Sequence, residues 1–337
     1  MTLPPPLVSQ ESEPATAQTA PVIEMKGVTK VYGDQVALDN VDLTVPAGVI
    51  LGLIGPSGCG KTTLVKLLTG IVRPTSGSVR VLGADPVDFG VSHRRRFGYM
   101  PQLPVLFPNL TVWGNMGFIS SVYGMSLRNR RARLKELLDL VDLGQHRHKL
   151  LSECSGGMQR RLTLASTLVH DPELLFLDEP TAGVDPILRE RFWDHFRSLR
   201  DQGRTVVVPT QYVGEAVTCD LVAVMATGRL ITVLPPDQLA HFAYGGVPLA
   251  VDVQDGWLAG SELARLADQP FVRGVRRTEQ GLVVVVDDPR TDTTHVQQLL
   301  HHANVQLGGI EPLEPSFDDI FVQIIQTNTT RAERAEL

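Results

Sequence analysis

The chain has 337 residues, of which 43% are hydrophobic and 20% are charged, a composition typical of folded globular domains. This length suffices for two domains of ordinary size. The formal net charge of -6 argues against a protein that binds nucleic acid by neutralising phosphates. Three cysteines, at positions 59, 154 and 219, form neither a CxxC pair nor a disulfide framework, which favours a reducing compartment.

The first 20 residues are rich in Pro, Ser, Thr, Ala and Gln and contain no aromatic residue. We therefore expect a disordered lead-in over residues 1–20. No apolar core follows Met1, so a secretion signal is not expected. No run approaches the ~18 apolar residues that cross a bilayer, so any action on a membrane requires a partner.

The first motif is a phosphate-binding loop. A predicted apolar strand over 49–54 leads into GPSGCGKT at 55–62, which fits G-x-x-x-x-G-K-[ST], and a helix-compatible run follows. Backbone N–H groups of such a loop and the positive end of the helix hold phosphates. We expect Lys61 to contact the β- and γ-phosphates and Thr62 to ligate Mg²⁺. The predicted nucleotide-binding residues here are Gly55, Pro56, Ser57, Gly58, Cys59, Gly60, Lys61, Thr62 and Thr63.

A second buried strand is predicted over 174–177, and it ends in Asp178 and Glu179. Together with the phosphate loop, this pair predicts a site for nucleotide hydrolysis. Asp178 is placed to hold Mg²⁺, and Glu179 to orient or deprotonate the attacking water.

A third apolar strand begins at Thr205 and is expected to stop at Pro209, which lacks the N–H needed for a sheet ladder. Gln211 follows, at the edge of the sheet where α/β proteins bind ligands. Gln211 could be part of the site, a substitute for another residue type, or an ordinary turn residue.

The segment between the phosphate loop and Asp178 carries a resemblance. Ser155, Gly156 and Gly157 match the core of the signature motif of ABC transporter ATP-binding subunits, with Cys154 at the usual Leu and Met158 at the usual Gln. Ser155 can cap the following helix and leave its amides open to an anion. The resemblance, over roughly 22–240, implies that this anion is the γ-phosphate of ATP held by a second copy of the domain.

Other residues match the family in order along the chain. Tyr32 matches an aromatic residue that stacks on adenine, and Gln102 a glutamine that contacts the metal and senses the membrane subunit. Residues 182–185 match a loop that crosses to the partner. Gln211 stands where most members have a histidine, and its amide can donate a hydrogen bond but carries no charge. A similar Thr-Gln-Tyr occurs in drug-exporter members, so we expect a working substitute.

The segment 111–150 resembles the helical subdomain of the family. Leu134, Leu137, Leu138 and Val141 recur at helical spacing and form one apolar face. Two basic clusters are either solvated surface or contacts with lipid headgroups or the membrane subunit. They comprise Arg94, Arg95 and Arg96, and Arg128, Arg130, Arg131 and Arg133.

Beyond residue 244 the pattern is strand 249–253, helix 261–267, strand 272–277, strand 282–286, helix 293–302 and strand 305–310. This order predicts a small α+β domain of the ferredoxin-like type. The following helix, in PSFDDIFVQIIQ, resembles the C-terminal extension of drug- and polysaccharide-type exporter ATPases. His295, His301 and His302 lack the paired ligands of a metal site, and we expect a solvated helix face.

The expected fold is an α/β P-loop NTPase of the ABC cassette type, with a mixed sheet core and antiparallel β and helical subdomains, plus the C-terminal domain. The expected boundaries are 1–20 for the lead-in, 21–244 for the cassette, 245–327 for the accessory domain and 328–337 for a flexible tail.

The resemblance implies an ATPase that binds ATP and Mg²⁺. It implies a cytoplasmic protein at the inner face of the cell membrane that pairs head to tail with a second copy and drives a separately encoded permease, exporting a drug-like, lipid or polysaccharide substrate. Nucleic acid is not an expected partner. The alternatives are an ABC ATPase outside transport and a regulatory ATP binder without turnover. In a head-to-tail pair, Cys59 of one copy is expected to approach Cys154 of the other.

Overall fold

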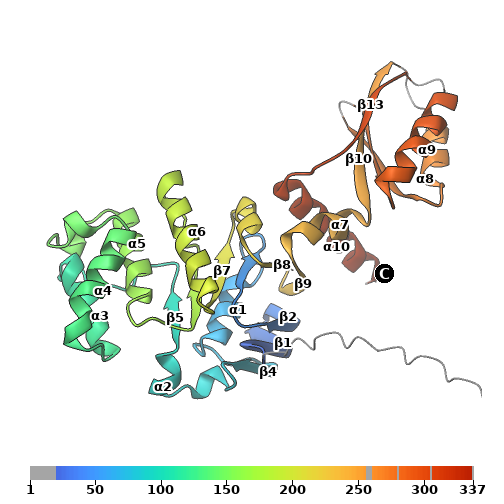
Figure 1. Cartoon of the computed structure of the whole chain (residues 1–337). Helices are drawn as coiled ribbons and strands as arrows, with labels where there is room; N and C mark the ends of the chain where they lie inside the picture. Colours follow the sequence, from blue (N-terminus) through green and yellow to red (C-terminus); the bar gives the residue numbers. More distant parts are fainter. Residues whose placement is uncertain (1–19, 256–259, 279–280, 304–305, 336–337) are drawn as a thin grey trace, which may run out of the picture.

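The computed structural model describes residues 20–255, 260–278, 281–303 and 306–335 (Figure 1). The predicted lead-in, apart from Ala20, lies outside these residues. Within the described residues no helix is long and apolar enough to cross a membrane.

The core of the molecule is a six-stranded sheet. Its strands in order are β5 (Phe97–Met100), β6 (Leu174–Leu177), β7 (Thr205–Thr210), β3 (Ile50–Ile54), β8 (Leu221–Ala226) and β9 (Arg229–Leu234). The first five strands are parallel and β9 is antiparallel, so the sheet is mixed, as predicted. Every residue of β3, β6 and β7 is buried, because both faces of the sheet are covered.

The predicted end of β7 at Pro209 was wrong by one residue. The strand continues to Thr210, and Leu53 and Ile54 of β3 pair with Pro209 and Thr210. Pro209 cannot donate a hydrogen bond, but its carbonyl still accepts one from the backbone N–H of Glu179 at 2.9 Å.

Different layers cover the two faces of the core sheet. One face packs against α1 (Lys61–Leu68) and a three-stranded antiparallel sheet, and the other against α5 (Gly156–Thr167) and α6 (Pro186–Asp201). The antiparallel sheet has the order β2 (Gln35–Val45), β1 (Ile23–Tyr32) and β4 (Ser76–Val81). The short connecting helices are α2 (Val91–Arg94), η1 (Pro86–Asp88), η2 (Gly144–His146), η3 (Leu151–Glu153) and η5 (Pro236–Gln238).

The helical subdomain forms the end of the molecule opposite the C-terminus (Figure 1). It consists of α3 (Val112–Val122) and α4 (Leu127–Leu140), which pack against α5. The predicted apolar face is confirmed, because Leu134, Leu137, Leu138 and Val141 are all buried in one core with α5.

The C-terminal unit follows the predicted order of strands and helices. Its elements are β10 (Val247–Asp255), α8 (Gly260–Ala267), β11 (Val272–Thr278), β12 (Gly281–Val286), α9 (Pro289–His302) and β13 (Gln306–Pro312). The four strands form an antiparallel sheet in the order β11-β12-β10-β13. Leu266 of α8 and Val296 and Leu300 of α9 fill a core on one face of this sheet.

The last helix returns from this unit to the cassette. α10 (Phe317–Ala335) packs against α7 (Leu239–Tyr244) and against η4 (Val213–Thr218), the turn that follows β7 (Figure 1). Ile320 and Ile324 are buried in the same core as Ala216 and Leu239. Residues 328–335, for which we predicted a flexible tail, form the last part of α10.

Candidate functional site

A cleft of about 620 Å³ lies at the carboxyl ends of β3, β5, β6 and β7, beside the β1–β2 hairpin. This is the edge at which α/β sheets bind ligands. The predicted site residues that line it are Tyr32, Ser57, Gly58, Gly60, Lys61, Thr62, Thr63, Gln102, Asp178, Glu179 and Gln211. The cleft therefore brings together side chains that are far apart in the sequence.

The phosphate loop owes its shape to glycine. Gly60 has φ 108°, a conformation that other residues rarely adopt, and a Cβ there would lie 2.7 Å from the carbonyl oxygen of Ala37. α1 begins at the next residue, Lys61, so the first amides of the helix face the cleft. This geometry suits a bound phosphate.

Lys61 is held by the loop itself. Its Nζ donates to the carbonyl oxygens of Gly55 at 2.6 Å and Pro56 at 3.0 Å, and the residue is only 9% exposed. Gly55 and Pro56 do not line the cleft, so their contribution is these two carbonyl groups. The ammonium group is thereby placed at the floor of the cleft.

Asp178 is buried with part of its carboxylate unsatisfied. Its Oδ2 is inaccessible to solvent and has no hydrogen-bond partner among the residues that the structure describes. Burial, and then the neighbouring Glu179, raise the pKa of the Asp178 carboxyl to about 6. A buried carboxylate oxygen without a partner is suited to coordinate a cation, because a nearby cation would favour the charged form of the carboxylate.

Glu179 has a strained backbone. Its φ is 50°, in the left-handed region that non-glycine residues rarely occupy. The N–H of Glu179 donates to the carbonyl of Pro209 on the neighbouring strand at 2.9 Å. This turn carries the Glu179 side chain out of the strand and into the cleft.

Gln211 joins two parts of the cleft. Its amide N–H₂ donates to Oε1 of Glu179, and its Oε1 accepts from the hydroxyl of Ser57 at 3.0 Å. Each of these partners belongs to a predicted motif. Gln211 therefore links the phosphate loop to the predicted base, which an ordinary turn residue would not do.

Arg160, on α5, was missed by the sequence analysis. Its guanidinium donates to the backbone carbonyls of Asp178 at 3.1 Å and Gln102 at 3.3 Å, and also to that of Glu179. Helix α5 is thus tied to two of the three predicted metal ligands, Gln102 and Asp178. An arginine just after the signature glycines was the available sequence signal, but its backbone partners are not encoded by any motif.

Glu215, on η4, was also missed. It is 6% exposed and accepts hydrogen bonds from the hydroxyls of Thr181 at 2.6 Å and Thr210 at 2.9 Å. Thr181 follows Glu179 by two residues, and Thr210 directly precedes Gln211. The buried carboxylate therefore fixes the loops that carry both predicted catalytic residues.

Five further residues line the cleft without having been predicted. They are Gln35, Val36, Ala37, Thr227 and Gly228. The β8–β9 turn is joined to the phosphate loop, because the N–H of Gly228 donates to the carbonyl of Cys59 at 3.1 Å. No sequence pattern marks this neighbour, since β8 and β9 are distant in the chain from the loop.

The signature residues lie outside the cleft of their own chain. Ser155 caps α5 by accepting from the N–H of Met158 at 3.3 Å, as predicted. Ser155, Gly156 and Gly157 are exposed and do not line the cleft. These residues are consequently available to another molecule.

The predicted approach of Cys59 to Cys154 between two copies is disfavoured by the burial of both side chains. Cys59 is 3% exposed in the core beneath the phosphate loop, and Cys154 is 7% exposed in the core of the other face. Burial raises the pKa of both thiols. Both side chains point into the protein, because each fills an apolar core.

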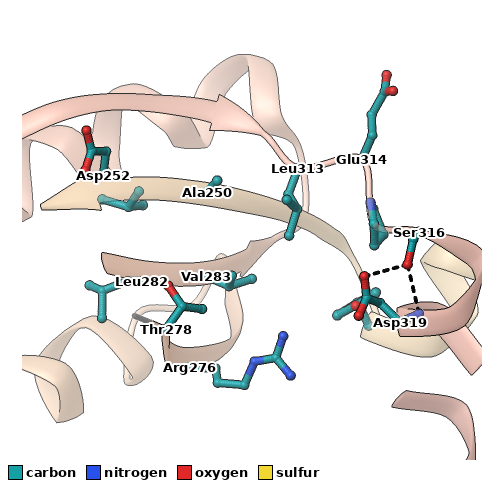
Figure 2. Close-up of a pocket in the computed structure, with 13 residues that line it drawn as sticks. Ala250, Asp252, Arg276, Thr278, Leu282, Val283, Leu313, Glu314, Ser316 and Asp319 are labelled. Carbon is teal, nitrogen blue, oxygen red and sulfur yellow. Dashed lines mark hydrogen bonds between the residues drawn. The ribbon is translucent and has the colours of Figure 1, made fainter. Parts of the chain in front are cut away.

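A second cavity, of about 340 Å³, lies where the C-terminal sheet meets α7 and α10 (Figure 2). Asp252 and Arg276 reach it from the sheet, and Ser316 and Asp319 from the start of α10. The Ser316 hydroxyl caps α10 by accepting from the backbone N–H of Asp319 at 3.2 Å, and it donates to Asp319 Oδ2 at 2.7 Å. The side chains of Asp252 and Arg276 form no hydrogen bond or salt bridge within the described residues, and this cavity holds none of the predicted site residues.

The chain is similar in sequence to proteins of one family. The family model described as "ABC transporter" matches residues 38–182. The daunorubicin resistance ATP-binding protein DrrA3 of Streptomyces coeruleorubidus is 36% identical over 304 residues, which cover 90% of this chain and 95% of that protein. The probable multidrug ABC transporter ATP-binding protein YbhF of Escherichia coli is 41% identical over 218 residues, and the aligned part spans 38% of its length.

Solved structures share the cassette. An ATP-binding subunit of an ABC transporter is 26% identical with a TM-score of 0.62, covering 66% of this chain and 93% of that one. A dimeric bacterial ABC transporter cassette is 28% identical with a TM-score of 0.60, covering 63% and 98%.

Proposed function

Because the chain belongs to the ATP-binding proteins of ABC transporters, we propose that it is the ATP-hydrolysing subunit of an exporter and powers a separately encoded membrane permease. The observation that carries this proposal is the convergence of Lys61, Asp178, Glu179 and Gln211 on one cleft. A regulatory ATP binder without turnover would not need the Gln211 link between Glu179 and the phosphate loop.

The cleft residues have distinct proposed roles. Tyr32, 44% exposed at the end of β1, stacks on the adenine ring. The phosphate loop and Lys61 hold the β- and γ-phosphates. Glu179 accepts the proton of the attacking water, and Gln211 keeps the Glu179 carboxylate in place.

The donor set also fits Mg²⁺. Thr62, Gln102 and Asp178 all line the cleft and offer oxygen ligands, which Mg²⁺ prefers. The unsatisfied Oδ2 of Asp178 supports the assignment. When bound, Mg²⁺ would neutralise charge on the phosphates.

Two copies are proposed to form a head-to-tail pair. The cleft contains no signature residue, yet Ser155 caps an exposed helix N-terminus that suits an anion. In the pair, this helix end of one copy contacts the γ-phosphate held by the other. A dimeric cassette among the structural relatives supports this arrangement.

The permease is proposed to dock beside Gln102. The residues after Gln102 expose apolar side chains: Leu103 and Val105 are each 77% exposed and Phe107 is 46% exposed. Phe107 also meets the exposed Phe118 of α3 edge to face, at 4.7 Å between ring centroids. An apolar patch next to a metal-binding loop suits a partner that senses nucleotide.

We also propose a location at the inner face of the cell membrane and a drug-like, lipid or polysaccharide cargo. The names of relatives, which include a daunorubicin resistance protein and a Nod factor export protein, support export. The C-terminal unit is proposed to be a ferredoxin-like domain, supported by the strand order β11-β12-β10-β13 with both helices on one face.

The test combines hydrolysis with co-purification. The purified chain should release phosphate from ATP only with Mg²⁺ present, and Lys61→Ala should abolish this. Co-expressed with the membrane protein of a neighbouring gene, the tagged chain should retain that protein in detergent. Hydrolysis without any retained membrane protein would contradict the transport role and favour an ABC ATPase outside transport.

A further inference from the structure

The helical subdomain and the residues before it carry an unusual charge distribution. Residues 89–135 contain no Asp or Glu, although the whole chain has a net charge of -6. The segment contains eight basic residues of the Lys and Arg types: Arg94, Arg95, Arg96, Arg128, Arg130, Arg131, Arg133 and Lys135. Part of this charge gathers around a cavity.

The cavity has a volume of about 340 Å³ and lies between α3, the start of α4 and the segment after η2. We call it the basic groove. Its lining residues are Trp113, Leu127, Arg130, Arg131, Arg147 and His148. It shares no residue with the nucleotide cleft.

The arginines of the basic groove lack the carboxylates that other arginines have. Arg96, Arg200 and Arg204 pair with Glu173, Asp220 and Asp171 at 2.6 to 2.8 Å. By contrast, no carboxylate of the described residues lies within 4.0 Å of Arg130, Arg131 or Arg147.

Two of these side chains are nevertheless fixed in place. Arg130 donates from Nη2 to the carbonyl of Met125 at 3.0 Å, while its buried Nε has no partner in the described part of the chain. Arg147 donates from Nε to Nε2 of His148 at 2.9 Å. Cations held together without a counter-charge repel one another, and an anion in the groove removes that repulsion.

The rest of the lining is apolar. Trp113 is half-buried, with part of its ring packed on the core, and Leu127 is 79% exposed. Arginines beside tryptophan and an aliphatic side chain are typical of protein surfaces at the boundary between water and membrane. A free phosphate would use only the charged half of the groove.

We propose that the basic groove binds the phosphate headgroup of an anionic phospholipid, so that the helical subdomain contacts the membrane surface directly. The proposal rests on the proposed function in one respect, because the permease is what brings the chain to the membrane. Lipid binding itself is measured without permease and without ATP, so it can fail or succeed independently of the transport role.

The first experiment is co-sedimentation of the full chain with vesicles. Binding to vesicles of phosphatidylcholine with phosphatidylglycerol should exceed binding to phosphatidylcholine alone and should weaken with salt. The double variant Arg131→Gln/Arg147→Gln should bind about 25-fold more weakly, at about 5-fold per arginine near an anionic surface. Both residues are exposed, so the fold and the ATPase activity should be retained.

The matched control removes the same charge elsewhere. Arg80→Gln/Arg191→Gln changes two exposed arginines on β4 and α6 and should bind vesicles as the parent does. Equal losses in both double variants, or none in either, would overturn the groove as the site. Two results together would assign the groove to a soluble phosphate and refute the lipid. They are full competition by glycerol phosphate against the vesicles and no preference of the chain for vesicles that contain phosphatidylglycerol.

The second experiment places the lipid at Trp113. Brominated phosphatidylglycerol should quench tryptophan fluorescence in the parent, and Trp113→Phe, which preserves the packing, should lose that quenching. Quenching that persists in Trp113→Phe would contradict the site. Loss of permease co-purification in Arg131→Gln/Arg147→Gln with vesicle binding unchanged would instead assign the groove to an acidic permease segment and overturn the proposal.

Discussion

The nucleotide cleft and the cavity of the C-terminal unit differ in how firmly their polar side chains are held. In the cleft, Gln211 bonds to Glu179 and Ser57, and Lys61 bonds to two carbonyls. In the other cavity, the side chains of Asp252 and Arg276 form no hydrogen bond or salt bridge to described residues (Figure 2). A site for chemistry needs side chains that are held before the substrate arrives; in the C-terminal cavity only Ser316 and Asp319, at the start of α10, are held, and they bond to each other.

The largest expected effect is in the cleft. Glu179→Gln should lower ATP turnover by about 1000-fold, because the amide cannot accept the proton of water. Nucleotide binding should be retained, as measured with a fluorescent ATP analogue beside a phosphate-release assay. Glu314→Gln, the same change in the C-terminal cavity, should leave turnover at the parental level. Near-parental turnover of Glu179→Gln would remove Glu179 as the base.

The next effect is on stability. Glu215→Ala should lower the free energy of unfolding by about 3 kcal/mol, since it leaves the buried hydroxyls of Thr181 and Thr210 without an acceptor for their protons. Urea titration measures the change. Glu314→Ala is the control and should stay within about 0.5 kcal/mol of the parent. If the two variants unfold alike, the Glu215 contacts add nothing and the contrast between the regions is weaker than described.

A smaller effect is expected at Gln211. Gln211→Ala should lower turnover by about 10-fold, because the Glu179 carboxylate loses its hydrogen-bond donor. Gln211→His should remain active and gain a pH dependence near ~6.5 from the imidazole. Steady-state rates across pH test both variants. Parental turnover of Gln211→Ala would make the residue an ordinary turn residue.

The smallest effect is expected in the C-terminal cavity. Arg276→Ala should change the free energy of unfolding by less than about 0.5 kcal/mol and leave ATP turnover unchanged, because the exposed guanidinium has no fixed partner. Thermal unfolding and phosphate release provide the readouts. A clear change in turnover would show that this cavity communicates with the cleft.

Much of the cleft could be predicted because its residues belong to local motifs. Gly60 must be glycine for the loop to turn, and Asp178 and Glu179 must follow a buried strand, so each is marked by its immediate neighbours. Gln211 and Tyr32 also line the cleft, and both had been selected from their order relative to the motifs along the chain. The elements of the C-terminal unit were also predictable, because its strands and helices show clear periodicity.

Other features could not be predicted because they depend on contacts between distant segments. Arg160 donates to backbone carbonyl groups, and because every residue has one, the sequence does not show which of them it contacts. Glu215 accepts from threonine hydroxyls that belong to no recognised motif. The burial of Cys59 and Cys154 was not predicted either, for a related reason. A motif fixes the position of a residue, whereas core packing decides where its side chain points.

The return of α10 to the cassette has a consequence for synthesis of the chain. Ile320 and Ile324 fill the core beside Ala216, which lies in the turn just after Gln211. A ribosome makes α10 only after the whole C-terminal unit. Until then, the apolar surface around η4, next to the cleft, stays exposed on the nascent cassette. A gene fragment that stops at residue 244 should therefore yield a cassette prone to aggregation, even though every nucleotide-binding motif is present.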